Sequence, residues 1–188
     1  MRVRRFDIDG PLIWAPERHA DARGWVSPSW SAADLAAVGV DFRVAQENLT
    51  LTHPGALRGL HWQEPAQAKL IEVVEGRVYD VLVDLRPGSP TLGRWCAAWL
   101  DAELGELLYA PRGFAHGFCV PVGAPPARVR YRLDAPWAPA GARSLRWDDP
   151  LLGIPWPVGA PLLSPADAAA PGWGTLFPGA LPPPPPSR

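Results

Sequence analysis

Residues 69–85, KLIEVVEGRVYDVLVDL, decide the fold class. Two runs rich in valine, leucine and isoleucine stand on either side of Glu75-Gly76. β-Branched residues are enriched in strands, and glycine supplies the backbone freedom that a tight turn needs. The stretch therefore predicts two strands joined as a β-hairpin.

More strands are predicted on the C-terminal side of this stretch. In residues 128–133, RVRYRL, arginines alternate with Val129, Tyr131 and Leu133, which is typical of a strand with one charged and one buried face. Residues 93–100 and 113–122 are further candidates, and glycine- and proline-rich turns separate them. Many short strands at this spacing predict an all-β fold, either a sandwich or a jelly-roll barrel.

Helical patterns are few and short. SAADLAAVG, Ser31 to Gly39, predicts one helix with Ser31 as its N-cap. SPADAAA, Ser164 to Ala170, predicts another with Ser164 as its N-cap and Pro165 at the first helical position. We therefore expect a β-structure with only a few short helices.

The length of 188 residues indicates a single domain, which we place at residues 1–175. The remaining residues, 176–188, are proline-rich and are expected to form an extended, mobile tail. A polyproline II ligand is the alternative for this tail.

Composition excludes several classes of function. The net charge of −1 gives no basic excess for nucleic-acid binding. No apolar run approaches the roughly 20 residues that span a bilayer, and the start, MRVRRFDIDGPL, lacks the apolar stretch of a signal peptide, so a cytoplasmic location is expected. Cys96 and Cys119 have no zinc-site or disulfide spacing and are interpreted as small core residues.

Lys69 is the only lysine among 18 basic residues, and all the others are arginine. Codon bias replaces lysine wherever a charge alone is needed, so a remaining lysine suggests a site that requires a compact ammonium. Chance is the alternative.

Two of the four histidines lie in strand-like segments beside glycines, His61 in LRGLHWQ and His116 in PRGFAH. Glycine allows a ligand or another backbone to approach closely. PRGFAH fits the second motif of the cupin barrels, but the H-x-H of the first motif of metal-binding cupins is missing. Two histidines fall short of the three or four ligands of an imidazole-rich metal site, so we expect a cupin-type jelly-roll without a metal.

A pocket lined by His61, His116, Lys69 and Tyr131 suits proton abstraction next to a carbonyl. A neutral histidine removes the proton, and an ammonium stabilises the enolate oxygen. A tyrosine on the opposite face returns a proton and so inverts the stereocentre. A core aromatic with a hydrogen-bonded hydroxyl is the alternative for Tyr131. No cofactor is required.

A histidine base needs a carboxylate behind its second ring nitrogen. The residues leave five candidates open, and for the last of them S-x-x-D also predicts a plain helix cap. They are Asp80, Asp84, Asp148, Asp149 and Asp167.

Four long motifs resemble the dTDP-4-dehydrorhamnose 3,5-epimerase family. They are NLTLTHPGALRGLHWQ, QAKLIEVVEGRVYDVLVDLRPGSPTLGRW, LYAPRGFAHGF and RWDDPLLGIPWP, and the similarity runs from about residue 7 to about residue 171. The resemblance implies a jelly-roll cupin fold, a homodimer and no metal. It also implies a dTDP-4-keto-6-deoxyhexose substrate that is epimerised at C3, C5 or both.

The resemblance also assigns roles to individual residues. His61 matches the base, Asp167 its partner, Tyr131 the proton donor and Lys69 the lysine near the substrate. The positions that match nucleotide-sugar contacts are Arg23, Gln46, Asn48, Arg58, His116 and Trp137, the last standing where the family usually has a tyrosine against the thymine.

Three positions depart from the family pattern: Pro28 and Ala142 replace glutamates, and Ala166 replaces a lysine. All three are binding positions, so an epimerase restricted to C3 or C5 is one alternative. A metal-dependent cupin oxygenase or isomerase and a non-catalytic sugar-nucleotide binder are alternatives of other classes.

Overall fold

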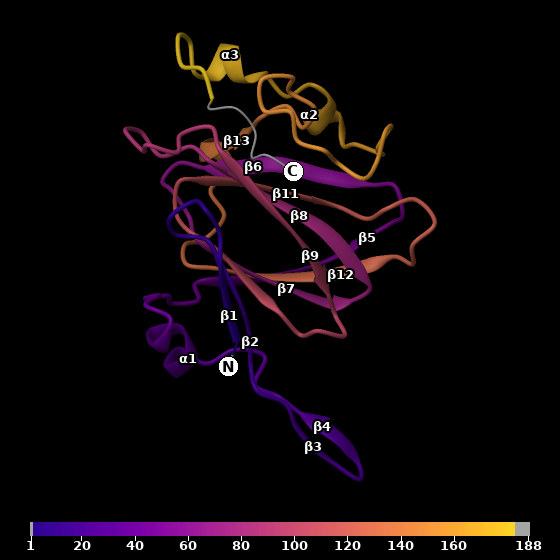
Figure 1. Cartoon of the computed structure of the whole chain (residues 1–188). Helices are drawn as coiled ribbons and strands as arrows, with labels where there is room; N and C mark the ends of the chain where they lie inside the picture. Colours follow the sequence, from indigo (N-terminus) through magenta and orange to yellow (C-terminus); the bar gives the residue numbers. More distant parts are fainter. Residues whose placement is uncertain (1, 183–188) are drawn as a thin grey trace.

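The computed structural model describes residues 2–182, and the fold is built around two large β-sheets (Figure 1). The six-stranded sheet has the order β1-β2-β10-β7-β12-β5, and the five-stranded sheet has the order β13-β6-β11-β8-β9. Neighbouring strands in both sheets run antiparallel. The predicted all-β jelly-roll with a few short helices is confirmed.

The elements follow one another along the chain with short connections. The strands are β1 (Arg2–Arg5), β2 (Leu12–Ala15), β3 (His19–Asp21), β4 (Gly24–Val26), β5 (Gln46–Thr52), β6 (Leu57–Gln63), β7 (Lys69–Glu75), β8 (Arg77–Asp84), β9 (Trp95–Asp101), β10 (Leu107–Ala110), β11 (Phe114–Cys119), β12 (Ala127–Leu133) and β13 (Ala142–Ser144). The helices are α1 (Ala32–Ala37), α2 (Pro165–Ala168) and α3 (Trp173–Leu176), with a 3-10 turn at Pro139–Gly141.

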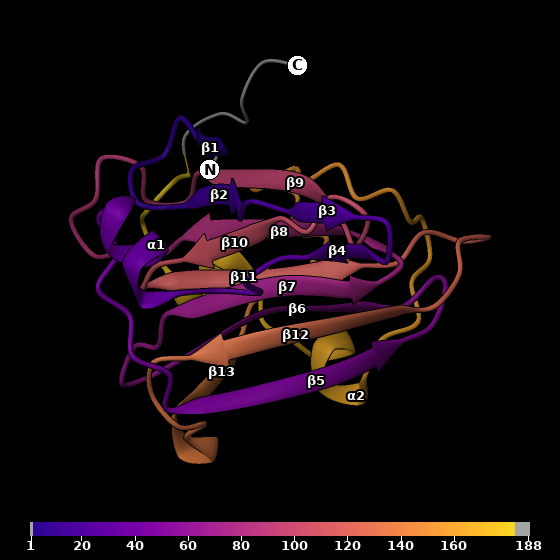
Figure 2. The same ribbon diagram turned by 90° about the horizontal axis from the view of Figure 1, so that it is seen from below.

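The main core lies between the two sheets. Ile71 and Val73 of β7 meet Leu82 of β8 and Phe118 of β11 in one buried cluster. A second cluster covers the outer face of the six-stranded sheet with α1, and a third packs the C-terminal segment onto the outer face of the five-stranded sheet. Figure 2 shows the strands of the six-stranded sheet lying side by side, with α1 at one end.

The hairpin predicted for residues 69–85 is wrong. β7 pairs with β10 and β12, whereas β8 pairs with β11 and β9 in the other sheet. The chain crosses between the sheets at Gly76, where φ is +77° and an added Cβ would lie 2.8 Å from the carbonyl oxygen of Pro126. A glycine turn marks a change of direction, but it does not determine whether the strands on either side pair.

The predicted helices are confirmed, because Ser31 caps α1 and Ser164 caps α2 through their hydroxyls. Both cysteines are buried and free, as expected. Among the described residues, no helix has the length and apolar character needed to cross a membrane. Phe177 stacks on Trp173 with ring centroids 4.3 Å apart, while residues 183–188 of the predicted tail lie outside the described residues. The domain boundary at residue 175 stays a prediction.

Candidate active site

Two adjoining cavities open into the barrel interior. The first has a volume of about 420 Å³ and the second of about 490 Å³. His61, Lys69 and Tyr131 line both cavities, so these three side chains stand where the cavities meet. His61 comes from β6 of the five-stranded sheet, whereas Lys69 and Tyr131 come from β7 and β12 of the six-stranded sheet. The structure therefore brings together three of the four predicted catalytic residues from strands that are distant in sequence.

An irregularity in strand pairing shapes the first cavity. His116 of β11 lies opposite His61 of β6, but Phe118 lies opposite Arg58, so the register shifts between the two pairs. Successive side chains of a regular strand alternate between its faces, which would put residues three apart on opposite sides. The shift allows both Arg58 and His61 to line the first cavity.

His61 pairs with the fourth predicted catalytic residue. Its Nε2 lies 2.5 Å from Oδ1 of Asp167, whose side chain is 3% exposed, while the imidazole is 43% exposed. Burial raises the pKa of Asp167, but the hydrogen bond and charge of His61, together with Ser164, outweigh burial and leave this pKa below its usual value. Asp167 is therefore an ionised carboxylate placed to accept an Nε2–H from His61, and because Nε2 is engaged in this way, Nδ1 is the ring nitrogen available to act as a base.

Asp167 has a local role as well as this distant one. Its backbone N–H donates to the Ser164 hydroxyl over 3.1 Å, which caps α2. The segment before α2 is held against β6, because Leu57 N–H donates to the Leu162 carbonyl over 3.1 Å. The cap interpretation and the dyad interpretation of Asp167 are thus compatible, since the cap fixes the turn that delivers the carboxylate to His61.

Gly59 allows the strands behind this pair to approach closely. Its φ is +133°, and an added Cβ would lie 2.5 Å from Cα of Gly117. The backbone N–H of Gly59 also hydrogen-bonds the Asp167 carboxylate and helps to lower its pKa. Only glycine satisfies both requirements at this position.

Lys69 is anchored by the backbone of His61, the predicted base. Its Nζ donates a hydrogen bond of 3.2 Å to the backbone carbonyl of His61. Burial lowers the pKa of Lys69 to about 8, against the opposing charge of Asp80. The amine is therefore mainly an ammonium at neutral pH, with further N–H donors available to the cavity.

Tyr131 points into the barrel, as the alternation of residues 128–133 predicted. Burial raises the pKa of its phenol, and the charge of Arg58 opposes this only in part. The hydroxyl therefore keeps its proton at neutral pH and remains a donor. On the outer face Arg132 is 3% exposed rather than open to solvent, and its guanidinium pairs with Glu47 at 2.8 Å and with Glu72 at 3.2 Å.

His116 is the second histidine of the first cavity, and it also pairs with a carboxylate. Its Nε2 lies 2.9 Å from Oδ2 of Asp80, and both side chains are buried. Burial lowers the pKa of His116, with Asp80 opposing the shift, so the imidazole is neutral. Among the five carboxylates considered from the sequence, Asp167 and Asp80 each hold a histidine.

The second cavity carries the other predicted contacts with a nucleotide. Trp137 donates its backbone N–H to Oε1 of Gln46 over 2.9 Å, and Gln46 donates its amide to Asn48 over 2.9 Å. The indole of Trp137 is 60% exposed at the rim and is free to stack on a base. Ala142 also lines this cavity, so the departure from the family pattern at this position enlarges it.

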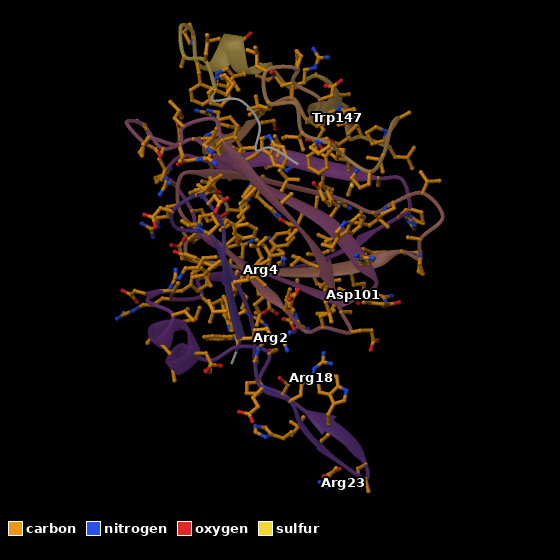
Figure 3. The ribbon with its side chains drawn as sticks, in the orientation of Figure 1. Arg2, Arg4, Arg18, Arg23, Asp101 and Trp147 are labelled. Atoms are coloured by element: carbon orange, nitrogen blue, oxygen red, sulfur yellow. The ribbon has the colours of Figure 1, made fainter. Side chains whose placement is uncertain are left out.

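Arg23 is the one predicted contact that the chain does not bring to its own cavities. It lies at the tip of the β3–β4 hairpin, which projects away from the barrel (Figure 3). Its side chain is 90% exposed and pairs with Asp21 at 2.5 Å. The hairpin base is attached through Arg18, which stacks over Trp25 at 4.2 Å and donates to the Glu103 carbonyl.

Several lining residues were missed from the sequence. Gln63 lies two residues beyond His61 on β6, so period-two alternation could have placed it on the same face. The same alternation could have placed Phe118 on the face of His116, which lies two residues earlier on β11. No comparable signal exists for Gln67, Arg143, Leu162 and Leu163.

The described residues contain no group of three or more His, Cys, Asp or Glu side chains able to hold a metal ion. The two histidines of the site are each bound to a carboxylate instead. A jelly-roll barrel with a histidine–aspartate pair, an ammonium and a phenol in one cavity defines a class of protein, the cupin-type barrels equipped for acid–base chemistry on a carbonyl compound.

The comparisons with known proteins identify the family within this class. The family model described as dTDP-4-dehydrorhamnose 3,5-epimerase matches residues 5–174, and the chain belongs to this family. A dTDP-4-dehydrorhamnose 3,5-epimerase from Neisseria gonorrhoeae is 42% identical over 88% of this chain and 51% of its own length. The chain thus spans about half of that relative. A dTDP-4-dehydrorhamnose 3-epimerase from Streptomyces niveus is 40% identical over 90% of this chain and 83% of its own.

A solved structure shows the same fold. The dTDP-6-deoxy-D-glucose-3,5-epimerase from Legionella pneumophila, in complex with dTDP-4-keto-L-rhamnose, superposes with a TM-score of 0.85 at 38% identity. The match covers 90% of this chain and 91% of the other.

Proposed function

We propose that this protein is an isomerase that epimerises a dTDP-4-keto-6-deoxyhexose at C3, C5 or both, without a cofactor, in deoxysugar biosynthesis. The observation that carries the proposal is the His61–Asp167 pair at 2.5 Å, in the same cavity as Lys69 and Tyr131. Base, electrophile and acid are the groups that inversion next to a ketone needs.

The reaction begins with His61. The free Nδ1 takes the proton from the ring carbon beside the C4 ketone, and the electron pair of the C–H bond moves into the enolate. The resulting imidazolium is stabilised by Asp167, which already accepts its Nε2–H. The proton later returns to solvent, so the base is regenerated.

The enolate oxygen needs a positive partner. Lys69 supplies an ammonium in a buried place, where a charge interaction is stronger than in water. An arginine fork requires more room and a planar partner, which explains why the single lysine of the chain stands here.

Inversion requires a proton from the opposite face. Tyr131 is on β12 and His61 on β6, so the two side chains approach the cavity from different sheets. The phenol donates its proton to the enolate carbon, and the tyrosinate recovers a proton from solvent. Exchange with solvent at the reacting carbon is therefore part of the cycle.

The nucleotide part of the substrate is placed in the second cavity. Trp137 stacks on the thymine, and Gln46 and Asn48 offer amide groups to its edge. Arg58 and His116, which line the first cavity, contact the diphosphate–sugar part, and a guanidinium suits a phosphate because it binds two oxygens at once.

Restriction to one carbon is the second candidate. The 3-epimerase from Streptomyces niveus is 40% identical to this chain, close to the 42% of the 3,5-epimerase from Neisseria gonorrhoeae, so overall similarity does not separate the two activities. Ala142 in the second cavity supports epimerisation at one carbon only. It stands where the family pattern has a glutamate, and the loss of that side chain changes how the nucleotide and sugar are held. Pro28 and Ala166 lie outside the lining of the two cavities.

The proposal includes a homodimer and a cytoplasmic location. In a dimer, the projecting β3–β4 hairpin is able to contact the second subunit. Trp25 and Val26 of the hairpin are 61% and 67% exposed, and Arg23 at its tip is remote from the cavities of its own chain. Mixing His61→Asn and Arg23→Ala subunits tests this arrangement. If Arg23 serves the partner's cavity, a mixed dimer holds one intact site and regains activity, whereas a hairpin that serves its own chain gives no recovery.

The function is tested by incubation with dTDP-4-keto-6-deoxyglucose in deuterium oxide, followed by NMR at C3 and C5. Deuterium with inversion at both carbons supports the 3,5-epimerase, and at one carbon the restricted enzyme. No exchange at either carbon contradicts the proposal and leaves a non-catalytic binder or a metal-dependent cupin. Stoichiometric iron, manganese or zinc in the purified protein would favour the latter.

A further inference from the structure

Trp137, the proposed stacking residue, lies on an irregular connection at the rim of the second cavity. Residues 134–138, between the end of β12 and the 3-10 turn at Pro139–Gly141, belong to neither a strand nor a helix. The indole of Trp137 is 60% exposed and takes part in none of the aromatic or cation–π pairs found among residues 2–182. The direction of this indole therefore depends on how the backbone around it is held.

Gln63 holds that backbone on both sides of Trp137. Its Nε2 donates to the carbonyl of Pro136 over 3.1 Å, and its Oε1 accepts the N–H of Ala138 over 3.1 Å. The Pro136 carbonyl belongs to the planar peptide unit that precedes Trp137, and the Ala138 N–H belongs to the unit that follows it. Because only φ and ψ of Trp137 relate these two planes, the pair of hydrogen bonds fixes both angles.

The amide of Gln63 is itself fixed and fully engaged. Gln63 is the last residue of β6, where it lies opposite Ala142 of β13, and it is only 6% exposed. Its Nε2 also donates to the Pro65 carbonyl over 3.4 Å, so both amide hydrogens have an acceptor within the protein. Gln63 thus lines the second cavity without an amide hydrogen left for a ligand, which separates it from the residues that contact substrate.

Two other glutamines bind the same connection. Gln46 of β5 accepts the N–H of Trp137 over 2.9 Å, and Gln67 donates to the carbonyl of Ala135. Of the three glutamines, only Gln63 binds both peptide units that flank Trp137. It also lies two residues beyond His61 on β6, so one strand places the proposed base and, through Gln63, the stacking residue.

We propose that Gln63 is a positioning residue that holds the Trp137 indole in place for the nucleobase before the nucleotide sugar binds. The effect on binding and turnover rests on the proposed function, because that function places the thymine in the second cavity. A side chain whose backbone is already fixed loses less conformational freedom on binding, so more of the stacking energy appears as affinity. The base is remote from the reacting carbons, so loss of Gln63 should weaken substrate binding without slowing the chemical step.

A double-mutant cycle with dTDP as the ligand tests the proposal. Gln63→Met is close to glutamine in length but removes the hydrogen bonds to Pro136 and Ala138. We expect this substitution to weaken dTDP binding, measured by calorimetry, by about 10-fold, which lies within the range for base–aromatic stacking. In a Trp137→Ala background the same substitution should change binding by less than about twofold, because nothing remains to be positioned. An equal loss in both backgrounds would overturn the proposal.

A measurement on the wild type decides the question if Gln63→Met does not fold. In ligand-free protein the backbone N–H groups of Trp137 and Ala138 should have ¹⁵N order parameters as high as those of β6, about 0.85. Clearly lower values would overturn the proposal. This readout needs neither nucleotide nor turnover. Wild-type protein that binds no dTDP would contradict the proposed function, whereas mobile Trp137 and Ala138 amides would contradict the role of Gln63.

Kinetics separate positioning from general destabilisation. Gln63→Met should raise KM for dTDP-4-keto-6-deoxyglucose by about 10-fold, with kcat close to that of the wild type. Ser31→Ala is the control, because it removes the 3.0 Å cap of α1 outside the lining of both cavities and lowers stability alone. Its KM and kcat should be unchanged. A fall of kcat with an unchanged KM in Gln63→Met would show a purely structural role and refute the proposal.

Discussion

Replacing Asp167 by asparagine tests the proposed base most directly. Asparagine has the same shape and its amide oxygen is able to accept the backbone N–H of Gly59, as the carboxylate does, but it carries no charge. The hydrogen bond between His61 and Asp167 measures 2.5 Å, and the Asp167 side chain is only 3% exposed, so the bond is shielded from solvent on the carboxylate side. The substitution therefore removes the charge that stabilises the imidazolium while leaving the turn before α2 in place.

The magnitude follows from the strength of that bond. Hydrogen bonds to charged groups contribute about 1.5–3 kcal/mol, and about 1.4 kcal/mol corresponds to a tenfold change in rate. Turnover of Asp167→Asn is therefore expected to fall by about 10- to 100-fold, measured as deuterium incorporation at the reacting carbons of dTDP-4-keto-6-deoxyglucose.

Ser164→Ala provides the matched control. It removes the 3.1 Å cap of the same helix and costs about 1 kcal/mol of stability, but it keeps the carboxylate. We expect a lower melting temperature and a loss of turnover clearly smaller than that of Asp167→Asn. If Asp167→Asn keeps full turnover, or Ser164→Ala loses as much, the charge of Asp167 is not what supports the base and the reasoning is wrong.

Three further predictions follow from the same cavity. Because only the ammonium of Lys69 stabilises the enolate, kcat of the wild type should fall as pH rises through about 8, and a rate still constant well above that pH would contradict the role. Tyr131→Phe should retain exchange of the abstracted proton for deuterium but lose inversion, so NMR that shows inverted product would rule out Tyr131 as the acid. Gly59→Ala should lower the free energy of unfolding by about 2 kcal/mol or more, measured by denaturant unfolding. The reason is that the added Cβ would lie 2.5 Å from Gly117 and that φ at this position is +133°. Wild-type stability in that variant would show that the strands can separate freely here.

Local patterns predicted much of the structure. Alternation along residues 128–133 placed Tyr131 on the inner face, and the S-x-x-D sequence predicted the start of α2. Such features depend on neighbours within a few residues, which is the range over which helix caps and strand faces are determined.

Relations between distant segments were beyond the same patterns. His61 and Asp167 are separated by 106 residues, and nothing near Asp167 distinguishes it from four other carboxylates except the family resemblance. The pairing of β7 and β8 was predicted wrongly for the same reason, since the two strands close on one core from opposite sheets. The exposed position of Arg23 likewise depends on the direction in which the β3–β4 hairpin projects, and the residues of the hairpin alone do not determine that direction.

The hydrogen bond from Lys69 to the backbone carbonyl of His61 has a consequence for carbon selectivity. One peptide unit carries the imidazole and also anchors the ammonium, so the separation between proton acceptor and ketone-facing cation is a fixed dimension of the barrel. A change of target from C3 to C5 then requires the hexose ring to rotate beneath a stationary pair of groups. Selection during divergence of such enzymes would therefore act on the walls that orient the ring, such as the one formed at Ala142, while the reacting groups keep their places.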